Sequence, residues 1–197
     1  MPESKLHLEL RTAVYLFLRL AFGERASVGS EQFVYWNPRE PRKCLAPDAM
    51  LKLGSQNDVF ATWKTWERGA PDVAVEIVSS TDARTWDSKL DEYHELGVRE
   101  LVRFDPEAAA GNRLEVWDLI DGDLAPREIT GDAAESRLLE GHFWVVRPYG
   151  SYEAALRLAV GSPSGVLVPT PEEREALRAD AAERRIAELE AELAKRG

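Results

Sequence analysis

Apolar residues at the start of the chain recur with the period of an α-helix. They fall at steps of mostly three and four residues, which places on one helix face Leu6, Leu10, Ala13, Val14, Phe17 and Ala21. Gly23 follows the last of them and is typical of the residue at which a helix ends. We therefore predict an amphipathic helix that packs one face on a core and stops near Gly23.

After this helix, short runs of strand-forming residues alternate with turn residues. Strands are predicted over residues 31–36, 48–53, 71–79, 100–104, 114–120, 124–129 and 143–146. Asp121-Gly122 separates two of these runs and is a strong hairpin signal. Residues 56–70 are compatible with a loop or a short helix, and residues 152–160 are expected to form a short helix.

The most apolar of these runs is Val73-Ala74-Val75-Glu76-Ile77-Val78. A strand that is apolar at nearly every position is typical of one buried on both faces. A polar loop is predicted over residues 80–85, followed by a helix over 86–96 that ends at Gly97, a residue suited to a left-handed cap. This strand, loop and helix would return the chain across one end of the sheet.

Near the C-terminus the composition changes twice. Residues 161–171 include Ser162-Pro163-Ser164-Gly165 and Pro169-Thr170-Pro171, which is typical of a linker. Residues 172–197 are rich in Ala, Glu and Arg, and the 3,4 spacing of a coiled-coil seam is followed by Ala179, Ala182, Ile186, Leu189 and Leu193. The seam lasts about two heptads, so a solvated single helix and a helix that contributes to a homodimer both stay open. We expect a domain over 1–160, a linker over 161–171 and a charged helical tail over 172–197.

The charge balance of the chain is acidic. Its 35 acidic and 25 basic residues give a formal net charge of −10. This excludes a general basic coat for nucleic acid, but it leaves room for a local basic groove or for a site whose metal ion supplies the positive charge. The one cysteine, Cys44, excludes a disulfide framework and a cysteine-rich zinc site. Neither a signal peptide nor a membrane-length apolar run is present, so we expect a protein of the reducing cytoplasm without a membrane partner.

Glu76 is the residue that points most directly to chemistry. A carboxylate in the middle of a buried strand needs a base, a hydrogen-bond network or a metal ion, because burying it alone costs several kcal/mol. A structural ion pair and a functional site both satisfy this need. Asp48 lies on another predicted strand, and neighbouring strands are about 4.8 Å apart, so the two carboxylates could share a cation. Asp72, four residues upstream on the same strand, would lie about 13 Å away, and a turn role suits it better.

Four other side chains could enter such a site. Lys89 lies on the helix predicted over 86–96, from which its ammonium could reach back to Glu76, although a surface pair with a nearby acid is an alternative. His7 and Glu9 flank the apolar face of the first helix on opposite sides. A half-buried core histidine and a solvated glutamate are the alternatives for them. Tyr93 suits packing better than catalysis.

The motifs occur in a specific order along the chain. This order is Ala46-Pro47-Asp48, Pro71-Asp72-Val73-Ala74-Val75-Glu76-Ile77-Val78-Ser79, Lys89-Leu90, Tyr93, Gly97-Val98-Arg99-Glu100 and Asp105-Pro106. It resembles the Uma2 family, which is assigned to the PD-(D/E)XK restriction-endonuclease-like superfamily, over about residues 4–146. The resemblance implies an α/β fold with a central mixed β-sheet flanked by helices, followed here by the C-terminal solitary or coiled-coil helix.

The resemblance also implies an activity and roles for individual residues. Asp48 matches the motif aspartate and Glu76 the first acid of the (D/E)XK element, while Val78 stands where most of the superfamily has lysine and Lys89 matches the lysine of this family. His7 matches a histidine that is common on the first helix. The implied chemistry is hydrolysis of nucleic-acid phosphodiester bonds, with DNA favoured. Asp48, Glu76 and the Ile77 carbonyl would hold Mg²⁺ or Mn²⁺, and Lys89 would position the water.

Three functions follow from these observations. The first is a metal-dependent endonuclease, which the Asp48, Glu76 and Lys89 set favours. The second is a catalytically inactive nuclease-like module for binding and oligomerisation, which the acidic balance and the short stretch before the first helix favour. The third is a phosphoesterase that acts on a small nucleotide, for which no extended basic track is needed.

Overall fold

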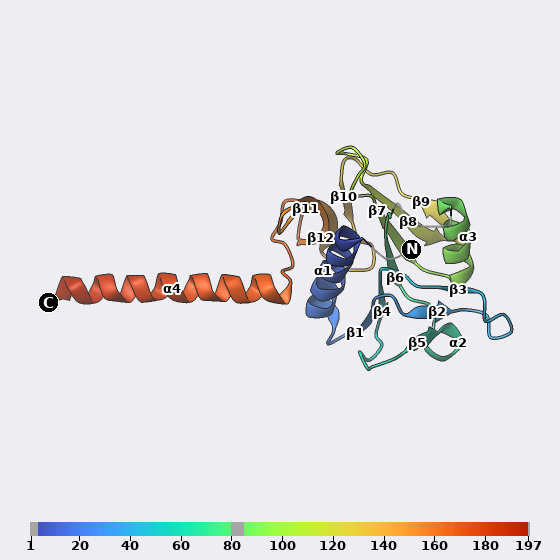
Figure 1. Ribbon diagram of the computed structural model, residues 1–197, viewed down its shortest axis with the longest axis horizontal. Coiled ribbons are helices and arrows are strands. Elements are labelled where there is room, and N and C mark those ends of the chain that lie inside the picture. Colours follow the sequence, from blue (N-terminus) through green and yellow to red (C-terminus); the bar gives the residue numbers. More distant parts are fainter. Residues whose placement is uncertain (1–3, 80–84, 197) are drawn as a thin grey trace.

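The computed structural model describes residues 4–79 and 85–196 of the chain. A six-stranded sheet forms its centre (Figure 1). In spatial order the strands are β1 (Ala26–Gly29), β4 (Ala49–Leu53), β6 (Val73–Ile77), β7 (Glu100–Phe104), β8 (Leu114–Ile120) and β9 (Asp123–Pro126). β6 and β7 are parallel and the other neighbours are antiparallel, so the expected central mixed sheet is confirmed.

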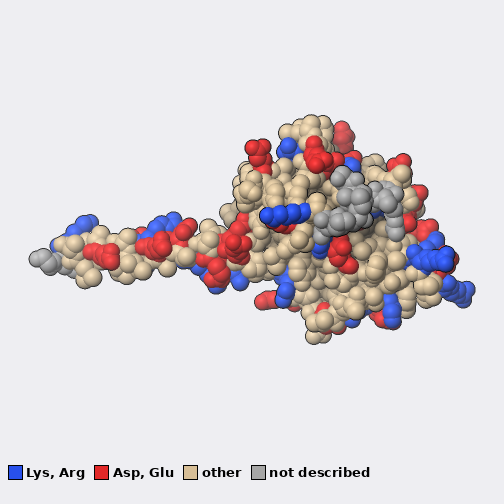
Figure 2. Space-filling view, in the orientation of Figure 1, with Lys and Arg blue, Asp and Glu red and all other residues tan. Residues whose placement is uncertain are grey.

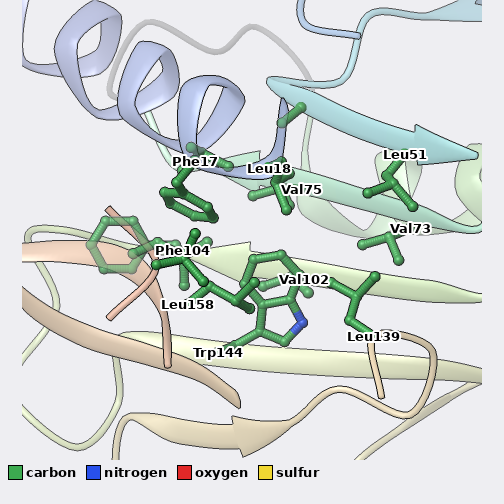
Figure 3. Close-up of a cluster of buried hydrophobic side chains, with 14 of the residues drawn as sticks. Phe17, Leu18, Leu51, Val73, Val75, Val102, Phe104, Leu139, Trp144 and Leu158 are labelled. Carbon is green, nitrogen blue, oxygen red and sulfur yellow. The ribbon is translucent and has the colours of Figure 1, made fainter. Parts of the chain in front are cut away.

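Two helices cover the two faces of β6. α1 (Lys5–Phe22) lies on the face to which Val75 points, and Figure 3 shows its Phe17 and Leu18 against that side chain. α3 (Trp86–Leu96) lies on the other face, where Ala74 belongs to the same apolar cluster as Tyr93. Both faces of β6 are therefore buried, as its continuous apolar sequence predicts.

The ends of α1 and α3 follow the sequence signals. The Ser4 side chain accepts a hydrogen bond from the His7 main-chain nitrogen at 3.1 Å and caps α1, and the helix stops at Gly23. Thr85 caps α3 in the same way, and Gly97 ends it with φ of 81°, in the left-handed region. Apart from Thr85, the polar loop predicted over 80–85 lies outside the described residues.

Two three-stranded sheets flank the central one. The first contains β3 (Cys44–Leu45), β2 (Phe33–Tyr35) and β5 (Thr62–Lys64), and the short helix α2 (Thr65–Arg68) follows β5. The second contains β10 (Ala133–Glu135), β11 (His142–Tyr149) and β12 (Tyr152–Val160), and it closes the core under α1, as Trp144 and Leu158 show in Figure 3. The ambiguous segment 56–70 therefore contains both a strand and a short helix.

The short helix predicted over 152–160 is wrong, because this segment is β12. It pairs antiparallel with β11 over nearly its whole length, and Leu156 and Leu158 are buried. Alanine, leucine and arginine favour helix, but pairing with β11 and burial against the core outweigh that preference. β1, β3 and β10 lie outside the predicted strands, since each is too short to show a pattern of its own.

α4 (Pro171–Arg196) extends from the body as a single helix (Figure 1). Its side chains from Glu175 to Lys195 are exposed, so tertiary contacts hold only its first turns. Within residues 4–79 and 85–196, no helix has the length and apolar character needed to cross a membrane.

A buried glutamate joins the central sheet to the β10–β12 sheet. Glu100 is fully buried, and its carboxylate accepts hydrogen bonds from the Ser136 hydroxyl at 2.7 Å, the Trp144 indole at 2.8 Å and the Arg137 main-chain nitrogen at 2.8 Å. An Arg127 guanidinium nitrogen lies 3.1 Å from the same carboxylate. These donors supply the pairing that a buried charge requires.

We predict that Glu100→Ala lowers the free energy of unfolding by about 2–5 kcal/mol, because it leaves the Ser136 hydroxyl and the Trp144 indole buried without an acceptor, at about 1–3 kcal/mol each. Arg127 keeps its ion pair with Asp118 in this variant. Urea unfolding followed by tryptophan fluorescence measures this loss. Glu128→Ala, at an exposed position near Arg127, should change the free energy by less than about 0.5 kcal/mol. A loss for Glu100→Ala no larger than that of the control would contradict the role given to this network.

Candidate active site

Two acidic residues meet at the carboxyl end of β6. The antiparallel pairing of Ala49 with Val75 places Asp48, the residue before β4, beside Glu76. One Asp48 carboxylate oxygen, Oδ2, accepts a hydrogen bond from the Ile77 main-chain nitrogen at 2.6 Å. Asp48 and Glu76 are 4% and 5% exposed, so both carboxylates are buried. The two strands thus bring together the two acids whose proximity the sequence predicts.

Helix α3 supplies two donors to Glu76. The Lys89 ammonium lies 2.7 Å from Glu76 Oε2, and the Tyr93 hydroxyl donates to Oε1. Lys89 and Tyr93 are four residues apart and therefore lie on the same face of α3. The Lys89 side chain is only 16% exposed, so it is a part of this buried cluster and not a solvated surface lysine. Tyr93 is fully buried, and it combines the predicted packing role with a direct bond to Glu76.

The surroundings of Glu76 change its protonation. Burial and, second to it, the negative charge of Asp48 raise the pKa of Glu76 to about 7, although Lys89 and Tyr93 act to lower it. Burial and the neighbouring Glu76 charge also raise the pKa of Tyr93 well above its usual value of 10, so its hydroxyl stays protonated and donates. The cluster has excess negative charge, which a bound cation would relieve.

His7 reaches the same strand end from α1. Its Nε2 atom lies 3.2 Å from Asp48 Oδ1 and 3.2 Å from the Ile77 carbonyl oxygen. The side chain is 12% exposed, so the residue is half-buried as expected and also in contact with the candidate site. His7 therefore faces two of the three oxygen-bearing groups that the family resemblance assigns to a metal ion.

The structure places the other two candidate acids elsewhere. Glu9 accepts a hydrogen bond from the Tyr152 hydroxyl at 2.7 Å, on the opposite flank of α1 from His7. Asp72 lies just before β6, at its other end, and accepts hydrogen bonds from the Leu53 main-chain nitrogen at 2.8 Å and the Lys52 ammonium at 3.2 Å. These contacts fix β12 and β4 in place, so they favour structural roles for both acids.

Two cavities open on either side of the end of β6. One has a volume of about 190 Å³ and is lined by Glu76, Ile77, Val78, Ser79, Trp86, Lys89 and Arg103. The other has a volume of about 230 Å³ and includes in its lining His7, Ile77, Ser79, Asp105 and Glu107. Ile77 and Ser79 belong to both, so the candidate site is accessible from each side of the strand.

Trp86 and Arg103 line the first cavity although sequence reasoning did not assign them to the site. Arg103 on β7 pairs in register with Glu76, and its guanidinium lies 5.1 Å from the centre of the Trp86 ring. Glu115 and Asp105 form ion pairs with the same guanidinium. The sequence does contain a clue to Arg103, because it is a charged residue within the largely apolar strand 100–104. The sequence contains no comparable clue to Trp86.

The groups at this strand end suit a hard cation. Asp48, Glu76 and the Ile77 carbonyl supply only oxygen atoms, which Mg²⁺ and Mn²⁺ prefer. Each carboxylate oxygen of Glu76 accepts one hydrogen bond and keeps a second lone pair. Across the two described ranges, no three His, Cys, Asp or Glu side chains are grouped to hold a metal ion, so the main-chain carbonyl would be needed as the third protein ligand.

We predict that Glu76→Gln stabilises the metal-free protein at pH 8 and leaves its stability nearly unchanged at pH 4. The pKa of Glu76 is about 7 in the folded protein, against an ordinary value of 4.5. The folded state therefore binds the proton more tightly, and stability falls as the pH rises from about 4.5 to about 7. A shift of this size corresponds to about 3 kcal/mol.

Urea unfolding at several pH values in EDTA tests this difference. A glutamine cannot titrate, so the wild type and the variant should diverge between about pH 4.5 and 7. If the Glu76–Lys89 pair were instead a net stabilising ion pair, Glu76→Gln would be less stable than the wild type at pH 8.

Comparison with known proteins bears on what this cluster does. None of the curated proteins matches the chain. Among solved structures, it is similar to a crystal structure described as "a putative nuclease belonging to DUF820" from Anabaena variabilis, with 16% sequence identity and a TM-score of 0.47 over 78% of this chain and 76% of that one. A family model described as "Putative restriction endonuclease" matches residues 1–149. Because this match spans most of the chain, as the motifs around Asp48, Glu76 and Lys89 predict, the protein belongs to the Uma2 family.

Proposed function

We propose that this protein is a metal-dependent endonuclease that hydrolyses phosphodiester bonds of nucleic acid, with DNA the favoured substrate. The observation that carries the proposal is the buried Asp48–Glu76 pair with Lys89 bonded to it, at the wall of a cavity. Membership of a family described as "Putative restriction endonuclease" supports hydrolysis of a nucleic acid. A cytoplasmic location, expected from the single cysteine, belongs to the same proposal.

The metal ion in this proposal is Mg²⁺ or Mn²⁺. Asp48, Glu76 and the Ile77 carbonyl would hold it, since their oxygen atoms meet at one strand end and carry excess negative charge. When bound, the ion supplies positive charge to the phosphate and lowers the pKa of a water molecule. His7, which contacts both Asp48 and the Ile77 carbonyl, orients these two groups.

The residues around the ligands have distinct tasks. Lys89 keeps its ammonium beside Glu76 and inside the cavity, where it can orient the attacking water and stabilise negative charge as it develops on the phosphate. Tyr93 holds the other oxygen of Glu76 and fixes the direction of the carboxylate. Lys89 is therefore the catalytic lysine in this proposal, and Tyr93 is a positioning residue.

The surface charge explains why a local cation would matter. The net charge of −10 opposes the approach of a polyanion. On the face drawn in Figure 2, acidic and basic side chains are interspersed and form no continuous basic surface. Attraction for a phosphate would therefore depend on the cavity itself, where Lys89 and Arg103 are paired with acids and the bound ion would supply the net positive charge.

One observation favours the inactive nuclease-like module as the second candidate. Both oxygen atoms of Glu76 already accept hydrogen bonds from Lys89 and Tyr93, and this satisfies much of what a buried carboxylate requires without a metal ion. A protein of this kind would bind no divalent cation at Glu76. Titration calorimetry with Mn²⁺ separates the two candidates, because only the nuclease proposal expects heat that Glu76→Gln abolishes.

We predict that the purified protein cleaves single- or double-stranded DNA or RNA with Mg²⁺ or Mn²⁺ and not with EDTA. Lys89→Ala should lower the rate by about 10²-fold or more, because it removes the group that orients water. Gel assays with end-labelled substrates measure both effects. Lys64→Ala is the matched control and should leave the rate unchanged, since Lys64, at the end of β5, forms an exposed pair with Glu67 of α2.

Three outcomes would contradict this prediction. Cleavage that persists in Lys89→Ala would mean that the site is misplaced or that a contaminant acts. No cleavage by the wild type, together with no heat on Mn²⁺ titration, would leave the inactive module. Hydrolysis of a dinucleotide without cleavage of longer strands would favour a small-nucleotide phosphoesterase.

A further inference from the structure

The start of α4 is fixed to the body of the protein. Thr170 and Glu173 form a capping box, in which the Thr170 main-chain nitrogen donates to Glu173 Oε2 at 2.8 Å and the Glu173 nitrogen donates to the Thr170 hydroxyl at 3.3 Å. The buried Arg157 of β12 holds both Glu173 oxygens, at 2.9 Å and 2.7 Å. The direction in which α4 leaves the body is therefore set by its first turn (Figure 1).

The outer part of α4 carries an exposed apolar stripe. Ile186, Leu189 and Leu193 are 56%, 43% and 69% exposed. With Ala179 and Ala182 they follow the 3,4 spacing of heptad positions a and d, with Ile186 at a and Leu189 at d. A helix that is apolar on one stripe and polar elsewhere is typical of one that packs that stripe on a partner.

The stripe faces away from the body. The side of α4 that faces the body is given by Glu173, Leu177 and Asp180, which line a cavity of about 300 Å³ together with residues of β12 and the linker. At 3.6 residues per turn, these three side chains point to the opposite side of the helix from Ile186 and Leu189. The body would therefore lie on the outer side of α4 when a second helix packs on the stripe.

The charges beside the stripe fit a second copy of the same helix. In heptad numbering Arg178 and Arg185 occupy position g, and Glu183 and Glu190 occupy position e. In a parallel, in-register pair, g of one helix faces the following e of the other, so each arginine meets a glutamate. Glu192 also occupies position g. In an antiparallel pair, e faces e and g faces g, so Arg185 would meet Glu192 but Glu183 would oppose Glu190, whereas the parallel pair has no like-charged contact of this kind.

We infer that α4 joins two copies of this chain in a parallel two-stranded coiled coil. Isoleucine at a and leucine at d also favour two parallel strands. Arg185 now pairs with Glu188 of its own helix at 3.0 Å, but both side chains are 63% exposed, so this pair contributes little and can exchange. The interface is only about two heptads long and includes two alanines, so we expect a weak dimer that dissociates on dilution.

Sedimentation velocity of the full chain, from low micromolar to submillimolar concentration, tests the association. The wild type should shift from monomer to dimer, and Ile186→Asp with Leu189→Asp should remain monomeric. Ala187→Asp with Ala191→Asp, which places the same charges off the stripe, is the matched control and should still dimerise. A monomeric wild type, or a dimer that survives Ile186→Asp with Leu189→Asp, would overturn the inference, and neither result depends on nuclease activity.

A cross-link tests the orientation. With Cys44→Ser to remove the native thiol, Leu193→Cys should form a disulfide between two copies on mild oxidation, because position a of one parallel helix meets position a of the other. In an antiparallel pair Leu193 lies opposite Ala182, eleven residues and about 16 Å from the other Leu193. Arg185→Glu should weaken the dimer, and adding Glu190→Arg should restore it. A dimer without the cross-link, or without this rescue, would overturn the parallel arrangement.

Discussion

The burial of the Glu76 carboxylate is the constraint on which the candidate site depends. An ionised carboxylate out of water needs donors, and α3 supplies two of them from consecutive turns, Lys89 and Tyr93. Both side chains must face the same strand end, so this requirement also fixes where α3 lies on the sheet. Asp48, on the neighbouring strand, then adds a second negative charge that the two donors do not offset. The site is thus built with a charge imbalance that the fold alone does not relieve.

A second buried glutamate shows what a structural solution to the same problem looks like. Glu100 is as buried as Glu76, but it receives three short hydrogen bonds and the charge of Arg127, and these join two sheets. Glu76 receives two donors and faces another acid. Burial alone therefore does not identify a functional carboxylate. Glu100 also has a like-charged neighbour, Asp118, but Arg127 pairs with both of these acids. The feature that separates Glu76 is the cavity at the end of its strand.

Sequence reasoning could find the helices and strands whose residue pattern matches the burial that they have in the folded protein. The continuous apolar run of β6 predicts burial on both faces, and the single charge within it marks Glu76. Asp48 follows from topology, because the adjacent strand leads to the same edge of the sheet. For Lys89 the strand–loop–helix return only makes a contact with Glu76 possible, and the family resemblance is needed to prefer it over a surface lysine. β12 could not be found in this way, since its residues favour helix and only pairing with β11 makes it a strand. The contact between His7 and Asp48 depends on how α1 packs across the sheet, which spacing along the chain does not encode.

The charge of the chain links the proposed metal ion to the proposed substrate. Charges farther than about 8 Å from a phosphate are largely screened at physiological ionic strength, so only groups at the cavity decide whether a phosphate is attracted. There, Lys89 is offset by Glu76, and Arg103 is offset by Glu115 and Asp105. The negative charge of Asp48 is then left without an offset, and a bound divalent ion would make the net charge at the cavity positive. The ion and the phosphate have opposite charges, so a bound ion would raise the affinity for the phosphate, and by linkage the phosphate would raise the affinity for the ion by the same factor.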